Sequence, residues 1–336
     1  MDVSGRQTPQ GVQTMTTAIA LAADTRNAIT LADDLADAVR YLDAGVAPAT
    51  RRAYAQQWAA FAAYCDAADV AAMPAHPATV AAYVTARAGE GLAFASIRLA
   101  LAAIGQAHKL QGVASPTTAP AVQAIVRGIA RTHGTAQRQV APLLPSELRR
   151  VVAELDASAG DLRDRALLLL GFGGAFRRSE LVALTVADLA PTAGGLDVTI
   201  RRSKTDQTGA GRVVAVPYGS AADVCAVRAV QAWIAAAGIA DGAIFRSVDR
   251  HGNVAAAGLT GGAVARIVKA RCAAAGLDAD RYSGHSLRAG LATAAALAGR
   301  SDRAIMQQTG HKSRAMVDRY VRSADRWRDN AAAGLL

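Results

Sequence analysis

The sequence predicts a mainly α-helical protein of two domains, with a small antiparallel β-sheet in the second domain. Its 336 residues suit about two domains of ordinary size. Hydrophobic residues make up 52% of the chain and charged residues 19%, which indicates a globular rather than a disordered protein. Aromatic residues are only 4%, and Ala, a strong helix former, dominates the apolar residues. This composition favours packed helices over sheets.

Helical periodicity is clearest between residues 31 and 134. Two stretches place residues along one face of a helix, and these are Tyr54, Trp58, Phe61 and Cys65 in the first and Ile97, Leu101, Ile104 and His108 in the second. Thr50 is the expected N-cap of the first stretch. Shorter patterns at 31–44, 77–88 and 119–132 complete a predicted bundle of four or five helices. A position on such a stripe favours a packing role for His108 over a ligand role.

The helical pattern stops at residues 135–144, where a polar, basic and Pro-containing stretch predicts a linker. A second domain, 145–325, then begins at Pro145, because Pro followed by Glu147 is typical of a helix start. Further helices are expected near 161–172, 177–187, 221–236, 259–274, 285–298, 302–309 and 313–324.

A change of period inside the second domain predicts strands. Two β-branched runs, 196–201 and 212–216, flank a turn-rich segment and indicate an antiparallel hairpin with an extended loop. A short strand at 243–248 is expected to add to its sheet.

The two ends of the chain are expected to lie outside these domains. Residues 1–30 form a flexible lead-in, whose short apolar run, 18–23, lacks the length and the basic start of a signal peptide. Residues 326–336 form a C-terminal tail. No run of 18 apolar residues lacks charges, so no membrane span is expected. The three scattered cysteines exclude a disulfide scaffold and a cysteine-rich zinc module, and they suit a cytoplasmic protein.

The positive charge of the chain is concentrated in its second half. The net charge is +10, of which residues 1–140 contribute +2 and residues 141–336 contribute +8. A basic globular protein favours nucleic acid as its partner. Charge alone is equally compatible with a basic protein that has no specific partner.

Several chemically distinctive residues of the second domain recur in a particular order. They are Arg177, Ser179, Glu180 and Leu181 at a helix start, Lys204 in the hairpin turn, His285 and Arg288 three apart, Gly310 with His311, and Tyr320 nine residues later. Each alone has an ordinary explanation, such as a surface cation, a helix cap or a packing tyrosine. Their joint order and spacing is specific.

In this pattern the sequence resembles the tyrosine recombinases, also called the phage integrase family, which includes Cre and the Xer recombinases. The resemblance covers about residues 145–325 by motif, and about 30–135 more loosely by helical character. It implies a SAM-like, core-DNA-binding helical domain at 31–134 and an α+β catalytic domain at 145–325. The two domains would form a C-shaped clamp on DNA. The 30-residue lead-in is too short for an extra arm-binding domain, which favours the simpler Cre/Xer plan.

The resemblance implies that Tyr320 attacks a DNA phosphodiester, forming a 3′-phosphotyrosyl bond and releasing a 5′-hydroxyl. Arg177 and Arg288 would hold the non-bridging oxygens, because a guanidinium stays charged and its planar fork can bind two oxygens at once. Lys204 would protonate the leaving 5′-oxygen, since an ammonium can release a proton where a guanidinium cannot. The chain has four lysines against 33 arginines, which makes Lys at this position informative.

The remaining motif residues are expected to assist these groups. His285 would help to accept the proton of the tyrosine, and His311 would hydrogen-bond a phosphate oxygen. Glu180 would orient a histidine or an arginine, although an exposed helix acid is an alternative reading.

Double-stranded DNA is the expected partner, bound by a homotetramer, and no metal or nucleotide cofactor is expected. The sequence contains no phosphate-binding loop of the P-loop type and no Cys/His cluster with ligand spacing. The phosphotyrosyl bond conserves the energy of the phosphodiester, so rejoining needs no ATP. In relatives a C-terminal segment packs onto the neighbouring subunit, and Trp327, Leu335 and Leu336 could anchor one here, or the tail could fray.

Other functions compete with site-specific recombination. A type IB topoisomerase shares the Arg, Lys, Arg and Tyr chemistry, but the His285-to-Arg288 box and the compact length favour a recombinase. A catalytically silent DNA clamp would be expected to have lost motif residues. A small-molecule hydrolase lacks a visible water-activating pair or metal site, and a serine recombinase lacks its N-terminal catalytic block. The sequence leaves open the DNA target, the choice among integration, excision and dimer resolution, and any accessory proteins.

Overall fold

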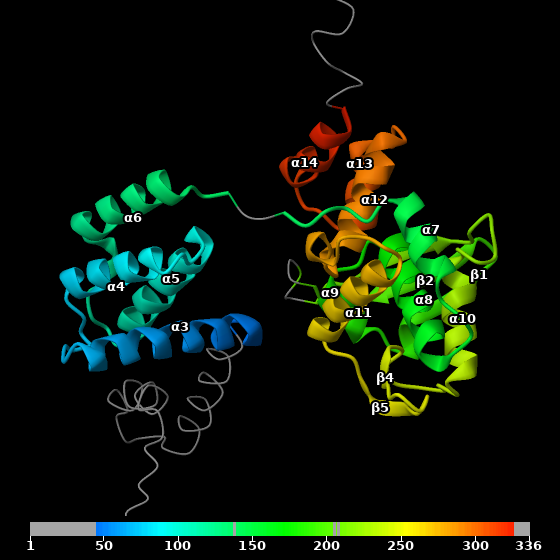
Figure 1. Cartoon of the computed structure of the whole chain (residues 1–336), viewed down its shortest axis with the longest axis horizontal. Helices are drawn as coiled ribbons and strands as arrows, with labels where there is room; N and C mark the ends of the chain where they lie inside the picture. The colour runs from blue at the N-terminus through cyan, green and yellow to red at the C-terminus, as the bar shows by residue number, and fades with distance from the viewer. Residues whose placement is uncertain (1–44, 137–138, 204–205, 207–208, 326–336) are drawn as a thin grey trace, which may run out of the picture. The chain divides into compact units, whose positions relative to one another are not determined.

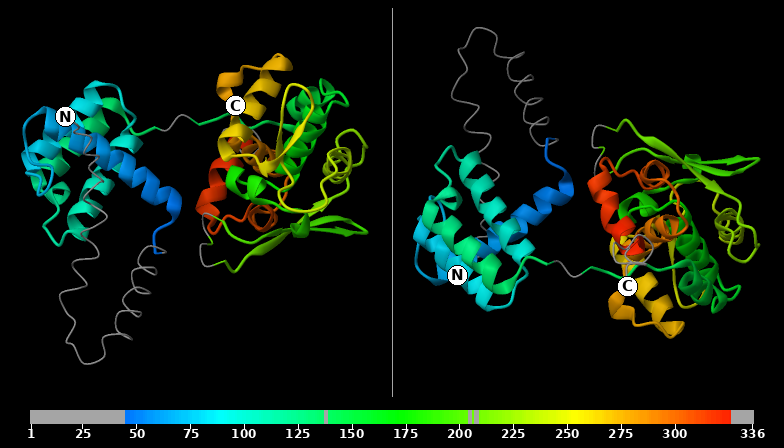
Figure 2. Two further views of the ribbon diagram at one scale, coloured as in Figure 1. Left: turned by 90° about the horizontal axis from the view of Figure 1, so that it is seen from below. Right: turned by 90° about the horizontal axis from the view of Figure 1, so that it is seen from above.

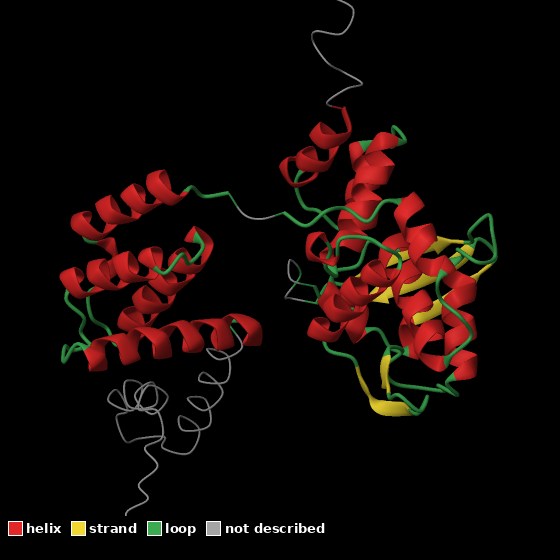
Figure 3. Cartoon of the chain, viewed as in Figure 1, coloured by secondary structure: helices red, strands yellow, loops and turns green. Residues whose placement is uncertain are grey.

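A computed structural model of the chain describes residues 45–136, 139–203, 206 and 209–325. The chain divides into two compact units, Met1–Arg138 and Gln139–Leu336. Helices dominate the described part of both units, and strands occur in the second (Figure 3). A mainly helical chain with a small antiparallel sheet confirms the predicted fold class. None of the described helices is long and apolar enough to cross a lipid bilayer.

The described part of the first unit is built from helices around one apolar core (Figure 1). They are α3 (Pro48–Ala67), α4 (Pro77–Gly89), α5 (Phe94–Leu110) and α6 (Pro120–His133), with a 3-10 turn, η2 (Pro116–Thr118), before α6. The stripes predicted on α3 and α5 face this core, where Phe61, Cys65 and Ile104 are fully buried. The helix expected at 31–44 and the lead-in 1–30 lie outside the described residues.

Proline opens helices of this unit. Pro48, Pro77 and Pro120 each stand at the start of a helix, where the missing N–H costs no hydrogen bond. The expectation that Thr50 caps α3 is wrong, because Pro48 starts the helix two residues earlier and Ala47 is its N-cap.

His108 is a buried residue of this core, as the packing reading predicted. Its ring Nδ1 lies 2.8 Å from the carbonyl oxygen of Ile104, and its Nε2 accepts from the backbone N–H of Ala75 at 2.9 Å. Because one partner is an acceptor and the other a donor, the ring is neutral with its proton on Nδ1. The histidine thereby ties the segment before α4 to α5.

The second unit surrounds a central helix, α8, with further helices and a three-stranded antiparallel sheet. The helices and 3-10 turns are α7 (Pro145–Ala153), α8 (Ala159–Gly173), α9 (Arg178–Ala183), η3 (Val186–Asp188), α10 (Ala226–Ala236), α11 (Gly261–Ala274), η4 (Ala279–Arg281), α12 (His285–Leu297), α13 (Asp302–Thr309) and α14 (Arg314–Asp325). The α8 helix packs against α10 and α12, and residues 167–170 of α8 are buried in the main core.

The sheet has the strand order β1 (Leu189–Thr192), β2 (Gly195–Ile200), β3 (Arg212–Pro217). Val198 lies opposite Val214 in the register, and both are buried, so the predicted hairpin is confirmed. Strand β1 was not anticipated, because its four residues include a proline and carry little β-branched character. In both views of Figure 2 the strands of this sheet lie along one edge of the second unit.

The strand expected to extend this sheet belongs to another one. Strand β4 (Arg246–Val248) pairs with β5 (Val254–Gly258) in a separate two-stranded sheet, so this expectation is wrong. The reason is local, because the Asp249 carboxylate accepts the backbone N–H groups of His251 and Asn253 and folds the chain back at once.

The chain enters the second unit along α12. The backbone N–H of Leu143 donates to the carbonyl of Ser286 at 3.0 Å, and the Leu143 side chain is fully buried. A Cβ on Gly290 would lie 2.0 Å from the Leu143 carbonyl oxygen, so this close approach requires glycine. The contact fixes the helix that carries His285 and Arg288.

Candidate active site

Glu180 and Arg177 form one half of a buried charged cluster. Arg177 precedes α9, and its backbone N–H donates to Glu180 Oε2 at 2.9 Å. The Arg177 guanidinium also donates to Glu180 Oε1 at 2.5 Å. The Glu180 side chain is only 1% exposed, which excludes the reading of an exposed helix acid. One carboxylate thus caps the helix and holds the arginine side chain in place.

Arg288 crosses from α12 into the same cluster and is 1% exposed. Its Nη1 donates to the carbonyl of Ala175 at 2.8 Å and to the carbonyl of Thr309. Ala175 has a φ of +49°, a left-handed conformation that costs an L-residue about 1–2 kcal/mol. That conformation presents the Ala175 carbonyl to the guanidinium two residues before Arg177.

The electrostatics of Arg288 show which groups surround it. The pKa of Arg288 is lowered to about 10, chiefly by burial and in addition by the cations of Arg177 and Arg212. Glu180 and Tyr320 act in the opposite direction and raise this pKa. Residues from α9, β3, α12 and α14 therefore meet around one guanidinium.

His311 and Tyr320 adjoin the arginines through the end of α13. The Thr309 hydroxyl lies 2.7 Å from His311 Nδ1 and donates to the carbonyl of Ile305 at 2.6 Å. The rings of His311 and Tyr320 are 5.9 Å apart between centroids, and both side chains are largely buried. Gly310, with a φ of +67°, ends α13 and turns the chain toward His311.

Arg212 is a member of the cluster that the sequence reasoning missed. It is the first residue of β3, and its Nη1 donates to the carbonyl of Gln308 at 3.1 Å. Its Nη2 lies 3.7 Å from Glu180 Oε2. Burial lowers the pKa of Arg212, Glu180 raises it, and Arg177 lowers it. The sequence feature that could have identified it is its position at the start of the second strand of the predicted hairpin, directly after the loop that contains Lys204. From this strand its side chain faces the cluster.

This geometry can be compared with known proteins. Residues 142–326 match the phage integrase family. The xerD homologue of Selenomonas ruminantium, an integrase/recombinase, is 38% identical over 299 residues, covering 88% of this chain and 87% of that protein. The chain belongs to the phage integrase family. It is a site-specific recombinase of the tyrosine type, a class that cleaves and rejoins DNA strands.

Other relatives of this recombinase agree. The Cre recombinase of Escherichia phage P1 is 28% identical over 285 residues, covering 79% of this chain and 81% of that one. Among solved structures, the XerH site-specific recombinase bound to a palindromic difH substrate has the same fold. Its TM-score is 0.56 at 18% identity, over 78% of this chain and 72% of that chain.

Two of the sequence-predicted site residues of this recombinase are placed differently from the rest. His285 is the first residue of α12 and is exposed, one turn before the buried Arg288. Lys204 lies outside the described residues, between Ser203 and Asp206. Arg177, Glu180, Arg288, His311 and Tyr320 are the predicted residues that the structure brings together. Among the described residues, no three His, Cys, Asp or Glu side chains gather as a metal site would require.

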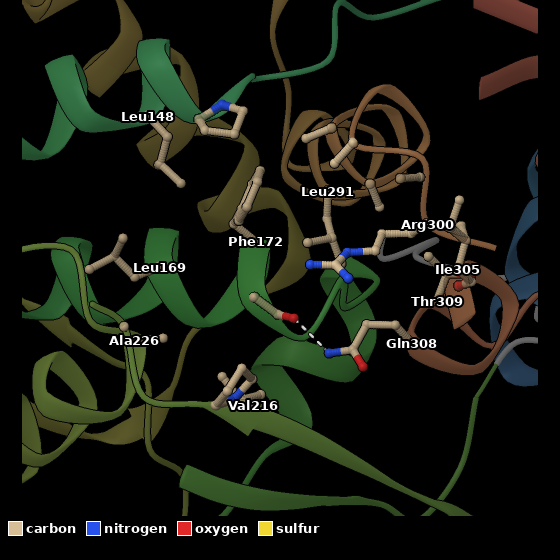
Figure 4. Close-up of a pocket in the computed structure, with 18 of the residues that line it drawn as sticks. Leu148, Leu169, Phe172, Val216, Ala226, Leu291, Arg300, Ile305, Gln308 and Thr309 are labelled. Atoms are coloured by element: carbon tan, nitrogen blue, oxygen red, sulfur yellow. Dashed lines mark hydrogen bonds between the residues drawn. The ribbon is translucent and has the colours of Figure 1, made fainter. Parts of the chain in front are cut away.

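A groove of about 580 Å³ adjoins the end of α13 (Figure 4). Its lining is mainly apolar, with Phe172, Leu291 and Ile305 among the residues that form it. The Gln308 side chain lies at this groove and donates to the carbonyls of Gly173 at 2.7 Å and Ala215 at 3.1 Å. Gln308 thus ties α13 to α8 and β3 with its side chain, while its own carbonyl accepts from Arg212.

Proposed function

We propose that Tyr320 is the nucleophile with which this recombinase cleaves and rejoins DNA at a specific site, through a 3′-phosphotyrosyl intermediate. One observation carries the proposal. Tyr320 is a largely buried phenol beside His311, and it acts electrostatically on Arg288 within a cluster rich in guanidinium groups. A packing tyrosine needs no such surroundings, whereas a phenol that attacks a phosphodiester needs cations around the phosphate.

In the proposed step, the Tyr320 oxygen forms a bond to phosphorus as the bond from phosphorus to the 5′-oxygen breaks. His285 takes up the phenolic proton, and Lys204 supplies a proton to the departing 5′-oxygen. Rejoining is the reverse reaction with a new 5′-hydroxyl, which displaces Tyr320 and restores the phosphodiester. The phosphate ester is exchanged and not hydrolysed, so atoms and charge balance without an energy source.

Arg177 and Arg288 bind the non-bridging oxygens in this proposal, and His311 adds a hydrogen bond to the phosphate. Glu180 is a positioning residue, because its carboxylate accepts hydrogen bonds from both the backbone N–H and the guanidinium of Arg177. Preorganised cations in a largely buried site stabilise developing negative charge more strongly than water does. Removing one such donor typically costs about 10²–10³ in rate.

Double-stranded DNA is the proposed partner, and four copies of the chain are the proposed assembly. Each chain carries one Tyr320, and exchange between two duplexes breaks four strands in all. Four nucleophiles therefore require four chains on the DNA. The +8 charge of residues 141–336 supports binding to a polyanion.

Covalent trapping tests the proposal. The protein is mixed with labelled duplexes from the regions flanking its own gene, denatured in detergent, and examined for an adduct. The wild-type chain is expected to give a detergent-resistant, protease-sensitive adduct, and Tyr320→Phe to give none. Tyr218→Phe is the matched control, because Tyr218 is 41% exposed in the same unit and should leave the adduct unchanged.

The outcomes separate the remaining alternatives. An equal adduct from Tyr320→Phe would overturn the assignment of the nucleophile. Salt-sensitive DNA binding without any adduct, over a broad library of fragments, would indicate a catalytically silent clamp. An adduct that religates but never yields exchanged strands would indicate a type IB topoisomerase-like nickase.

A further inference from the structure

Arg212 is held in place by groups from several elements. It begins β3, donates to the Gln308 carbonyl at the end of α13, and pairs with Glu180 at the start of α9. It also packs over Gly310, where a Cβ would lie 2.9 Å from Arg212 Nε. The side chain as a whole is 23% exposed, so it lies at the margin of the buried cluster.

Within the described part of the chain, two guanidinium nitrogens of this cluster have no hydrogen-bond acceptor. Arg212 Nη2 and Arg288 Nη2 are both buried, and neither has a hydrogen-bond partner among the residues that the structure describes. A buried donor without a partner costs about 1–3 kcal/mol, and more when the group is charged. Each of these arginines satisfies its Nη1 on a backbone carbonyl, which leaves Nη2 as the donor available to a bound anion.

Positive charge is in excess in this cluster. Arg177, Arg212 and Arg288 bring three positive charges against the single carboxylate of Glu180, which already accepts from Arg177 twice. Arg177 lowers the pKa of Arg212, and both of them lower the pKa of Arg288, as expected when like charges are brought together in a partly buried site. An anion with several acceptor oxygens would relieve the repulsion and supply partners for both Nη2 groups.

We infer that Arg212 is a third arginine of the phosphate site, donating from Nη2 to a non-bridging oxygen of the scissile phosphate. The inference rests on the proposed function. Nη1 remains on the Gln308 carbonyl and fixes the guanidinium, so that binding needs little reorganisation. Arg212 also links the strand that follows the Lys204 loop to the α13 end that precedes His311.

The experiment measures the rate of adduct formation at saturating concentrations of the duplex recovered by trapping. Arg212→Gln is expected to slow this rate by about 10²–10³-fold, the loss typical of one transition-state donor. Arg212→Lys should recover part of the loss, because it restores the charge but not the planar fork. The matched control is Arg228→Gln, which removes the same charge from an exposed position on α10 and should leave the rate unchanged.

A modified substrate distinguishes contact with the phosphate from a purely structural role. The same duplex is made with a methylphosphonate at the scissile position, which replaces one non-bridging oxygen by a methyl group. If Arg212 contacts that oxygen, Arg212→Gln should lose far less rate on one methylphosphonate isomer than on normal DNA. A residue that only positions Glu180 or α13 would show the same loss on both isomers as on normal DNA, and that result would overturn the inference.

The failure of this inference is separable from the failure of the proposed function. Wild-type protein that forms an adduct, with Arg212→Gln equally fast, overturns only the role of Arg212. Adduct formation that survives Tyr320→Phe overturns the proposed function itself. If Arg212→Gln unfolds, as circular dichroism would reveal, the comparison of the two substrates is made with Arg212→Lys, which keeps the charge and a long side chain.

Discussion

At the end of α13, two successive backbone carbonyls receive arginines from two other elements. Arg212 donates to the carbonyl of Gln308, and Arg288 donates to the carbonyl of Thr309. These carbonyls carry the partial negative charge of a helix C-terminus, so cations are stabilised there. Gly310 follows directly, and Arg212 lies against it. A single residue without a side chain therefore permits both the turn toward His311 and the approach of the guanidinium.

The first prediction concerns Gly310. Gly310→Ala should destabilise the second unit by roughly 1–2 kcal/mol from its left-handed φ alone, and further because the new Cβ displaces Arg212. The rate of adduct formation should fall as well, since the displaced Arg212 adjoins the phosphate site. Unfolding in urea and the trapping assay measure the two effects.

Gly299→Ala provides the control for Gly310→Ala. Gly299 has a φ of +70°, but a Cβ there would meet nothing within 4 Å. Gly299→Ala should therefore lower the free energy of unfolding through its left-handed φ, but it should leave the rate of adduct formation unchanged. Equal rates in both alanine variants would contradict a role for the Arg212 contact.

At the scale of elements, α12 is held in register by α7 and by the segment that precedes it. The Tyr282 hydroxyl donates to Glu147 Oε1 of α7 at 2.8 Å, just before α12 begins. The Tyr282 side chain is buried, and Leu143 crosses α12 at Gly290. These contacts lie outside the charged cluster, yet they determine where Arg288 stands.

The second prediction concerns the pH dependence of this element. Burial, followed by the hydrogen bond and the charge of Glu147, raises the pKa of Tyr282 to about 12. An unfolded tyrosine has a pKa of about 10, so between pH 10 and 12 the folded state keeps a proton that the unfolded state has lost. The free energy of unfolding should then fall as pH rises through this window, by at most about 3 kcal/mol.

Tyr282→Phe isolates that contribution. The variant should be less stable than wild type at pH 8, by about 1 kcal/mol for the lost hydrogen bond. Its free energy of unfolding should decline less steeply above pH 10, so the two curves converge. Urea unfolding followed by circular dichroism at pH 8 to 11 measures the difference in stability at pH 8 and its change with pH. Wild-type and variant stabilities that decline in parallel above pH 10 would contradict the prediction.

At the scale of the whole molecule, the chain distributes its charge unequally between two compact units. Residues 141–336, nearly the whole second unit, carry a net charge of +8, and residues 1–140 carry +2. Buried arginines near the proposed phosphate site account for part of this excess. The remainder is available for the phosphate backbone on either side of the cleavage site.

The third prediction follows from this charge. Binding that neutralises several phosphates releases counterions, so the affinity of the full chain for DNA should fall by about 10³–10⁵ between 50 and 200 mM salt. The slope of log Kd against log salt, measured by fluorescence anisotropy on a labelled duplex, gives the number of contacts. Arg212→Gln should reduce the slope by one contact at most, and a flat slope would contradict a phosphate-based interface.

Much of the fold could be predicted from the sequence, because helices and the hairpin are local. Apolar periodicity on α3 and α5, and β-branched runs in β2 and β3, report which face of each element is buried. The misplaced features depend on local competition that these patterns do not contain. Pro48 overrides Thr50 as the start of α3, and the Asp249 turn directs β4 to β5 and away from the hairpin sheet.

The candidate site, like the fold, was predictable from the sequence in part. The sequence by itself determined the residue types of the motif, from Arg177 to Tyr320, because phosphoryl transfer restricts which side chains can serve. Only the tertiary structure decided that Arg212 joins them. Among 33 arginines its type carries no signal, and its partners Glu180 and Gln308 lie 32 and 96 residues away in the chain. Contacts of that range arise when packed elements meet, and no local pattern records them.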